Sequence, residues 1–334
     1  MSVKSNQKRR SLTKILVASA MMVGLAALSF SSAQAAYPDR PITIIVPWGA
    51  GGGTDAVGRI FGNLLEQDLK VPVNVVNRDG GSGVVGHSAI INAEPDGYTI
   101  GIATVEVAMM HWVGLTKLTY ADFTVFAQVN QDPGGLMVSA DSPYKSAKDL
   151  LAAIKEKPAK TFKASGTGQG GIWHLGMAGW LLSEGVDVNK VPWVPSKGSA
   201  PALKDMVAGG VDFITSSLAE GRALIEAGKV LPLANMGEER LPLYPDVPTL
   251  KEATGSNWTV NVWRTIAGPK GVPQDVMDVL VPAIKRAYES DEYKKFMDGR
   301  GFGMIYRAPK EAYETMEKTD KSFGEVMKAA GLTN

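Results

Sequence analysis

The stretch that decides the fold is Ile42–Asp55, which reads ITIIVPWGAGGGTD. Its first five residues are all β-branched, and this composition predicts a buried strand over 42–46. The glycines that follow predict a tight loop, and Thr54 with Asp55 suits the start of a helix. The segment therefore predicts a strand, a glycine-rich loop and a helix in immediate succession.

The same unit recurs along the chain. Val73–Val76 leads through a loop of Asn, Gly and Ser into a helix from Val84, and Tyr98–Ala103 forms the next strand. Three further strand-and-loop units are expected to start at Phe162, Val191 and Phe213. Strands that alternate with helices at this spacing predict the α/β class, with mostly parallel sheets covered by helices on both faces.

The length of 334 residues favours two domains with cores of ordinary size. Two extended runs, Thr124–Val129 and Thr259–Ala267, are expected to carry the chain from one domain to the other and back. We therefore expect a first lobe over 36–130, a second lobe over 131–240, and a return crossover with the rest of the first lobe over 241–334. Two crossovers make a hinge.

The N-terminus has the pattern of an export signal. Residues 1–14 contain five basic residues and no acidic one. They are followed by the apolar run Ile15–Phe30 and by an A-x-A sequence within Ser31–Ala35. We expect residues 1–35 to be a signal peptide cleaved near Ala35, which places the mature protein in a periplasm. Lys8–Lys14 also resembles a twin-arginine signal, so the secretory and twin-arginine routes both remain open.

Composition excludes several classes of function. Without the five leader cations, 30 of the 35 Lys and Arg remain against 34 Asp and Glu, so the mature chain is mildly acidic and nucleic acid is not an expected partner. No cysteine is present to act as a nucleophile or a cluster ligand. His87, His111 and His174 lack the spacing of metal ligands. We therefore expect no metal and no cofactor.

The loops between strands and helices are richer in glycine than connection alone requires. In parallel α/β sheets these loops meet at the carboxyl edge of the strands, where ligands bind. The first N–H groups of each following helix are unpaired and carry partial positive charge. Such an edge suits an anion, most simply a carboxylate.

Several motifs together resemble the Bug family of periplasmic receptors, the solute-binding subunits of tripartite tricarboxylate transporters. They cover essentially the whole mature chain and are Tyr37–Ile42, Gly51–Asp55 with Arg59, Pro95–Thr99, Ser165–Gly168 with His174–Leu175, Gly209–Asp212 and Tyr244–Leu250. In addition, Trp263–Arg264 ahead of Ala267–Gly271 resembles the branch nearest the tricarboxylate receptors, which would favour citrate.

The resemblance implies a two-lobed type II periplasmic binding protein fold that closes on a small di- or tricarboxylate or an aromatic acid. It also implies a monomeric, non-enzymatic receptor that delivers its ligand to integral-membrane transporter subunits. One carboxylate end would be held by main-chain amides and bridging waters at the loops Pro47–Asp55 and Arg78–Gly83. The other end would face Ser165–Gln169 and Ser196–Ala200 of the second lobe.

The candidate ligand-binding residues are the members of these loops together with a few polar residues at strand ends. They are Trp48, Gly49, Ala50, Gly51, Gly52, Gly53, Thr54, Asp55, Gly80, Gly81, Ser82, Gly83, Thr104, Ser165, Gly166, Thr167, Gly168, Gln169, His174, Lys197, Gly198, Ser199, Ala200, Ser216 and Arg264.

Some of these candidates have structural alternatives. Asp55 could simply cap a helix, and Trp48 could pack at the hinge. His174 fits a structural position near the start of its helix, and Arg264 could form an ordinary salt bridge. Trp173 is expected in the core.

Two alternative functions stay open at this point. Gly81–Gly86 fits G-x-G-x-x-G after a predicted strand, and Glu106 follows at the spacing of a dinucleotide-binding fingerprint. This pattern would suit an exported Rossmann-type NAD-dependent oxidoreductase, although no catalytic His or Lys constellation accompanies it. A carboxylate receptor that feeds a membrane sensor kinase is the other alternative.

Overall fold

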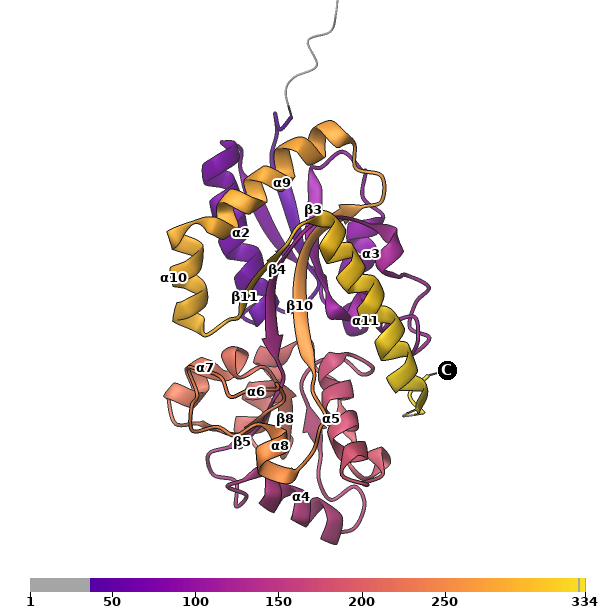
Figure 1. Ribbon diagram of the computed structural model, residues 1–334, viewed down its shortest axis with the longest axis vertical. Coiled ribbons are helices and arrows are strands. Elements are labelled where there is room, and N and C mark those ends of the chain that lie inside the picture. The colour runs from indigo at the N-terminus through magenta and orange to yellow at the C-terminus, as the bar shows by residue number, and fades with distance from the viewer. Residues whose placement is uncertain (1–36, 330, 334) are drawn as a thin grey trace, which may run out of the picture. The chain divides into compact units, whose positions relative to one another are not determined.

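The computed structural model describes residues 37–329 and 331–333. The predicted signal peptide lies outside the described residues. From Arg40 onward the chain builds two β-sheets flanked by helices (Figure 1). We call the elements around the first sheet the first lobe and those around the second sheet the second lobe.

The first sheet has the strand order β11-β4-β10-β3-β1-β2. Its strands are β1 (Ile42–Val46), β2 (Val73–Asn77), β3 (Thr99–Thr104), β4 (Phe123–Pro133), β10 (Asn261–Pro269) and β11 (Met304–Arg307). β1 pairs in parallel with β2 and β3, whereas β10 pairs antiparallel with both β3 and β4.

The second sheet has the strand order β7-β6-β8-β5-β9. Its strands are β5 (Gly135–Ser139), β6 (Ala164–Ser165), β7 (Trp193–Val194), β8 (Phe213–Ser216) and β9 (Val230–Asn235). β6 runs parallel to β7 and β8, and β5 runs antiparallel to β8 and β9.

The two-lobed α/β fold is confirmed, but the sheets are mixed rather than mostly parallel. The reason lies in the crossing strands. β4 leads out of the first sheet directly into β5, and β10 returns between β3 and β4, so each return places an antiparallel strand within the sheet. Figure 1 shows β4 and β10 side by side between the two lobes.

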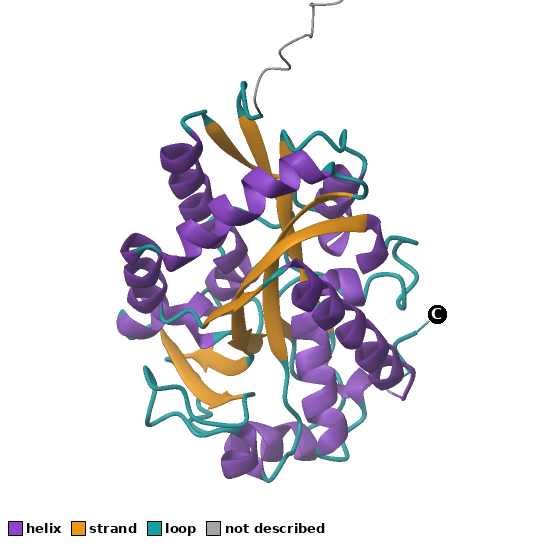
Figure 2. Ribbon diagram, turned by 45° about the horizontal axis from the view of Figure 1, so that its top comes forward, coloured by secondary structure: helices purple, strands orange, loops and turns teal. Residues whose placement is uncertain are grey.

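Helices cover the strands of both sheets (Figure 2). In the first lobe they are α2 (Gly53–Leu69), α3 (Val84–Ile91), α9 (Gln274–Glu289), α10 (Asp291–Arg300) and α11 (Pro309–Ala329). In the second lobe they are α4 (Ala147–Glu156), α5 (Ile172–Ser183), α6 (Ser199–Val207), α7 (Leu218–Glu226) and α8 (Leu250–Thr254). Short 3₁₀ turns are η1 (Gly81–Gly83), η2 (Val105–Ala108), η3 (Tyr120–Asp122) and η4 (Val188–Lys190).

The chain after β9 first packs on the second lobe, because α8 contacts α4 and β9 before β10 crosses back. The lobe boundaries expected from the sequence stay a prediction. Among the described residues, no helix combines the length and the apolar character needed to cross a bilayer.

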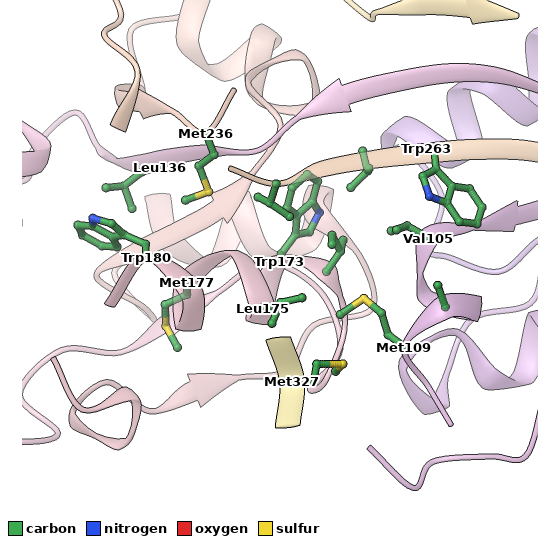
Figure 3. Close-up of a cluster of buried hydrophobic side chains, with 14 of the residues drawn as sticks. Val105, Met109, Leu136, Trp173, Leu175, Met177, Trp180, Met236, Trp263 and Met327 are labelled. Carbon is green, nitrogen blue, oxygen red and sulfur yellow. The ribbon is translucent and has the colours of Figure 1, made fainter. Parts of the chain in front are cut away.

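The apolar core is continuous from one lobe to the other. Val105 of η2, Met109 directly after it and Trp263 of β10 belong to the same buried cluster as Trp173 and Trp180 of α5 (Figure 3). The expectation that Trp173 is buried is confirmed, since 2% of its surface is exposed. This cluster lies beneath the loops that carry the candidate site.

Candidate functional site

A pocket of about 400 Å³, open solvent at its mouth included, lies where loops of both lobes meet. The first lobe contributes the β1–α2 loop, the end of β3 with η2, and part of β10. The second lobe contributes the β6–α5 segment and the starts of α6 and α7. The lining residues are Trp48, Gly49, Gly52, Gly53, Thr54, Thr104, Val105, Glu106, Thr167, Ile172, Trp173, Gly198, Ser199, Glu220, Val262, Trp263 and Arg264.

Four of the described helices begin at this pocket. α7 begins at Ser217, whose side chain accepts a backbone N–H, and each of the other three has a glycine at its N-cap. α2, α5 and α6 follow Gly52, Gly171 and Gly198, and a glycine has no side chain that could cap its helix. Elsewhere, α4, α8 and α10 begin at a Ser or Thr whose side chain accepts a backbone N–H. Glycine caps therefore leave helix N–H groups available at the pocket.

The N-terminus of α2 has two backbone N–H groups without an intramolecular partner in the part of the chain that the structure describes. Within the described residues, the backbone N–H groups of Gly53 and Thr54 have no hydrogen-bond acceptor. A side chain at position 53 would clash, because an added Cβ would lie 2.5 Å from Nη2 of Arg264. The pocket thus presents bare main-chain donors, with the positive end of the α2 dipole behind them.

Asp55 orders the loop that carries these donors. Its carboxylate accepts the Gly51 N–H at 2.9 Å, Nε of Arg59 at 3.0 Å and Nδ2 of Asn77 at 2.9 Å. Burial raises the pKa of the Asp55 carboxyl, but these hydrogen bonds outweigh burial and hold the pKa below its ordinary value. Asp55 does not line the pocket, so its contacts are those of a residue that orders the loop.

Thr104 connects the wall of the pocket to its interior. Its hydroxyl accepts Nε1–H of Trp48 at 3.2 Å and donates to Oε2 of Glu106. Its backbone N–H donates to Nε2 of His87 at 3.1 Å, and Nδ1 of His87 contacts the carbonyl of Gly83 at 2.8 Å. Both ring nitrogens are thus engaged as in a neutral imidazole with its proton on Nδ1. Burial lowers the pKa of His87 to about 4, which agrees with that form.

Glu106 belongs to η2 of the first lobe, and its side chain lies against the start of α5 in the second lobe. Its side chain accepts the Thr104 hydroxyl and the backbone N–H of Ile172, and only 3% of the residue is exposed. Burial raises the pKa of the Glu106 carboxyl, although these hydrogen bonds act in the other direction. One donor of the α5 terminus is therefore already bound by a side chain of this chain.

Arg264 is held by acids from both lobes. Its Nη1 lies 2.9 Å from Oδ2 of Asp132 in β4, and its Nη2 lies 2.6 Å from Oε1 of Glu220 in α7. Nε of Arg264 donates to the hydroxyl of Thr54 at 3.1 Å, and Nη1 also donates to Asn130. Every nitrogen of the guanidinium has a partner in the protein, which matches the salt-bridge alternative for Arg264.

Glu220 accepts two further donors. The hydroxyls of Ser199 and Ser216 donate to its Oε2 at 2.6 Å and 2.7 Å. Burial raises the pKa of the neighbouring Asp132 carboxyl, while Arg264 lowers it. The cluster ties α7 and the start of α6 to β4 and β10.

The candidate residues fall into two groups. Ten of them line the pocket: Trp48, Gly49, Gly52, Gly53, Thr54, Thr104, Thr167, Gly198, Ser199 and Arg264. The others lie outside that lining: Ala50, Gly51, Asp55, Gly80, Gly81, Ser82, Gly83, Ser165, Gly166, Gly168, Gln169, His174, Lys197, Ala200 and Ser216. For both groups, contact with a ligand stays a prediction.

Several residues of the second group join the lobes. The backbone N–H of Gly49 donates to the carbonyl of Lys197 at 3.0 Å, and Nζ of Lys197 lies 3.2 Å from Oδ2 of Asp79. A side chain at Gly168 would overlap Ser82, since an added Cβ would lie 2.3 Å from its Oγ. These contacts bring the first-lobe loops against the second lobe.

The described contacts of His174 are with residues of its own lobe. Its Nδ1 accepts the N–H of Gly170 at 3.1 Å, and its ring stacks on Trp193 with ring centroids 5.0 Å apart. Burial lowers the pKa of His174 to about 4.

Sequence reasoning missed the acids of the pocket and one of its tryptophans, Trp263, whereas Trp48 was among the candidates. Glu106 was considered only as part of a dinucleotide fingerprint, and Glu220 and Trp263 were not considered as site residues. A signal for Glu106 did exist, because it follows the carboxyl end of β3, where ligands of parallel sheets bind. Trp173 was expected in the core, and it both packs there and lines the pocket.

One glycine of the dinucleotide-like motif, Gly86, has a packing role here. An added Cβ at Gly86 would lie 2.4 Å from Cα of Pro47 and 2.6 Å from the carbonyl oxygen of Arg78. Gly86 therefore lets α3 pack closely on the loop after β1.

Comparisons with known proteins agree with this architecture. Residues 57–332 match the family model described as "Tripartite tricarboxylate transporter family receptor". A Pseudomonas sp. strain P51 protein from the tcbD–tcbE intergenic region is 33% identical over 298 residues, which are 86% of this chain and 87% of that protein.

Two solved structures are similar over nearly their whole length. The periplasmic binding protein BugD shares 28% identity at a TM-score of 0.83, over 89% of this chain and 99% of that chain. R. palustris Rpa4515, solved with adipate, shares 27% identity at a TM-score of 0.83, with the same coverage. The family match and the shared two-lobed fold lead to one conclusion: this chain belongs to the receptors of the tripartite tricarboxylate transporter family, with Bug proteins among its relatives.

Proposed function

We propose that the protein binds a small organic carboxylate in the pocket between its lobes and delivers it to the membrane subunits of a tripartite tricarboxylate transporter. Receptors of this family are periplasmic. We infer the same compartment here, reached through a signal peptide cleaved near Ala35, with the protein acting as a monomeric receptor and not as an enzyme.

The observation that carries the proposal is the bare N-terminus of α2. The N–H groups of Gly53 and Thr54 lack acceptors in the described residues and line a pocket to which both lobes contribute. A carboxylate placed there would accept charge-assisted hydrogen bonds and meet the positive end of the helix dipole. That a related receptor was solved with adipate supports this class of ligand.

The remaining pocket groups would orient the ligand and exclude water. Trp48 and Trp173 provide apolar walls, and Ser199 at the start of α6 adds a main-chain N–H from the second lobe. A ligand that contacts both lobes favours the closed form, and closure strengthens each hydrogen bond because bulk water leaves. The membrane subunits would then recognise the closed receptor.

A thermal-shift panel tests the proposal. Organic acids of two to eight carbons, with sugars, NAD and amines that lack a carboxylate as controls, are each added to the purified protein. We expect at least one carboxylate to raise the melting temperature in a concentration-dependent way, since a ligand that binds only the folded state stabilises it. Stabilisation by NAD, by sugars or by carboxylate-free amines alone would contradict the proposal.

A further inference from the structure

The pocket holds more acid than base. Its charged lining residues are Glu106, Glu220 and Arg264, and Arg264 is also paired with Asp132 just behind the lining. Because Asp132 and Glu220 already neutralise the arginine, no cation of the described lining is left for a second anionic group.

Glu106 occupies the place where the far end of a ligand would meet the second lobe. It accepts the N–H of Ile172 at the start of α5, and an added Cβ at the N-cap Gly171 would lie 3.7 Å from its Cγ. A ligand carboxylate at this terminus would have to share it with the Glu106 carboxylate. Like charges at such separation disfavour one another strongly in a buried site.

Two polar side chains at the pocket lack partners, and this observation is independent of the acids. Within the part of the chain that the structure describes, Oγ1 of Thr167 and Nε1 of Trp263 are buried without a hydrogen-bond partner, on residues only 5% and 3% exposed. Both residues line the pocket. In Figure 3 the ring nitrogen of Trp263 lies on the ring edge turned toward Val105 and Trp173. Buried polar groups are normally satisfied, so these two indicate a ligand that completes their hydrogen bonds.

We infer that the ligand is an aminocarboxylate, whose carboxylate binds the N-terminus of α2 and whose ammonium group is received by Glu106 with the hydroxyl of Thr167. The inference rests on the proposed function and narrows its ligand class. Trp263 can only donate, so its N–H serves the carboxylate. Thr167 can accept from the ammonium group, and Glu106 supplies the opposite charge.

Matched ligand pairs test the inference by calorimetry on the purified protein. Succinate is compared with β-alanine, glutarate with 4-aminobutyrate, and adipate with 5-aminopentanoate; propionate and alanine extend the series to an α-amino group. We expect at least one aminocarboxylate to bind at least tenfold more tightly than its partner without the ammonium group.

The outcomes separate this inference from the proposed function. Dicarboxylates that bind as tightly as their amino partners, or more tightly, in every pair overturn the inference and leave the carboxylate receptor intact. Binding by none of these acids overturns the inference, and the thermal-shift panel, which covers a wider range of acids, then decides the proposed function.

Variants locate the preference at Glu106. Glu106→Gln keeps the shape of the side chain and removes its charge, so the preference for the aminocarboxylate should fall at least tenfold. Glu156→Gln on the exposed face of α4 is the matched control and should leave it unchanged. An unchanged ligand preference in a folded Glu106→Gln variant would contradict the role of Glu106 in receiving the ammonium group. If that variant does not fold, the ligand pairs on the unmodified protein still decide whether an aminocarboxylate is preferred.

Discussion

Single residues decide how closely the two lobes approach at the pocket. Gly53 is the clearest case, because the Arg264–Glu220 ion pair lies directly against its Cα. Its conformation is compatible with any residue at the start of a helix, so the requirement for glycine is one of space. Sequence alone indicates a glycine loop and cannot indicate which of its glycines faces another side chain.

Gly53→Ala should therefore both destabilise the protein and weaken ligand binding. The added Cβ would overlap Oε1 of Glu220 at 2.4 Å, and such overpacking costs about 1–3 kcal/mol. Denaturant unfolding should report this loss, and calorimetry should report at least a tenfold weaker carboxylate affinity. Gly299→Ala is the control, because nothing lies near its added Cβ in α10, and it should be neutral or stabilising by up to about 1 kcal/mol. Equal behaviour of the two variants would contradict the steric account.

Arg264 provides a second prediction at the same scale. Arg264→Gln leaves Asp132 and Glu220 buried without their counter-charge, at 3% and 6% side-chain exposure. Removing one member of such a buried pair costs about 3–5 kcal/mol at pH 7. This loss of stability should shrink at pH 5, because burial raises the pKa of the Asp132 carboxyl, which can then take up a proton. The exposed pair of Arg286 with Asp68 is the control, and Arg286→Gln should cost less than about 1 kcal/mol. If the loss of stability in Arg264→Gln grew as the pH fell, the unpaired carboxylates would not be its cause.

At the scale of elements, His87 fixes α3 against β3. Its ring joins the carbonyl of Gly83, at the N-cap of α3, to the backbone N–H of Thr104, at the end of β3. Protonation of Nε2 would place two donors opposite each other at Thr104. The contact between α3 and β3 through His87 therefore requires the neutral imidazole ring, in agreement with a pKa of about 4 for His87.

This contact predicts acid destabilisation in a defined range. The folded pKa of about 4 lies below the unfolded value of 6.5, so the stability contributed by neutral His87 is complete above pH 6.5. It is lost progressively as the pH falls toward 4, and amounts to about 2 kcal/mol between pH 7 and pH 5. In His87→Gln, which does not titrate, this part of the pH dependence should disappear from denaturant unfolding. An identical slope in both proteins would contradict the neutral assignment.

Predictability also differs between elements. The helices with their own caps could be read from the sequence, since Ser146 before α4 accepts the Asp149 N–H as its position suggests. The strand–loop–helix units around β1, β2 and β8 were equally readable. The direction of β10 was not, because its place between β3 and β4 depends on how the returning chain enters the sheet. Likewise, the pairing of Glu106 with the start of α5 joins residues from different lobes, which no local pattern reports.

For the whole molecule, the main feature is that loops of the two lobes touch beside the pocket, and we expect closure to depend on this contact. Gly168 of the second lobe and Ser82 of the first leave no room for another side chain between them. The crossing strands β4 and β10 connect the lobes, and we expect the lobes to move about this connection.

Gly168→Leu should therefore hold the lobes apart without unfolding either. Small-angle scattering should report a larger radius of gyration than for the unmodified protein, and carboxylate affinity should fall at least tenfold because the second lobe no longer reaches the ligand. Gly299→Leu on α10 is the control and should change neither quantity. A Gly168→Leu variant with unchanged affinity would mean that closure at this contact is not needed for binding.

The central claim is that bare main-chain donors of α2 hold a ligand carboxylate between the lobes. The most direct measurement is a crystal structure of the protein with the tightest-binding acid from the thermal-shift panel. The account predicts a carboxylate oxygen within hydrogen-bond distance of the N–H groups of Gly53 and Thr54, with Trp48 against the ligand. A ligand bound outside this pocket, or bound with no carboxylate oxygen at α2, would contradict it.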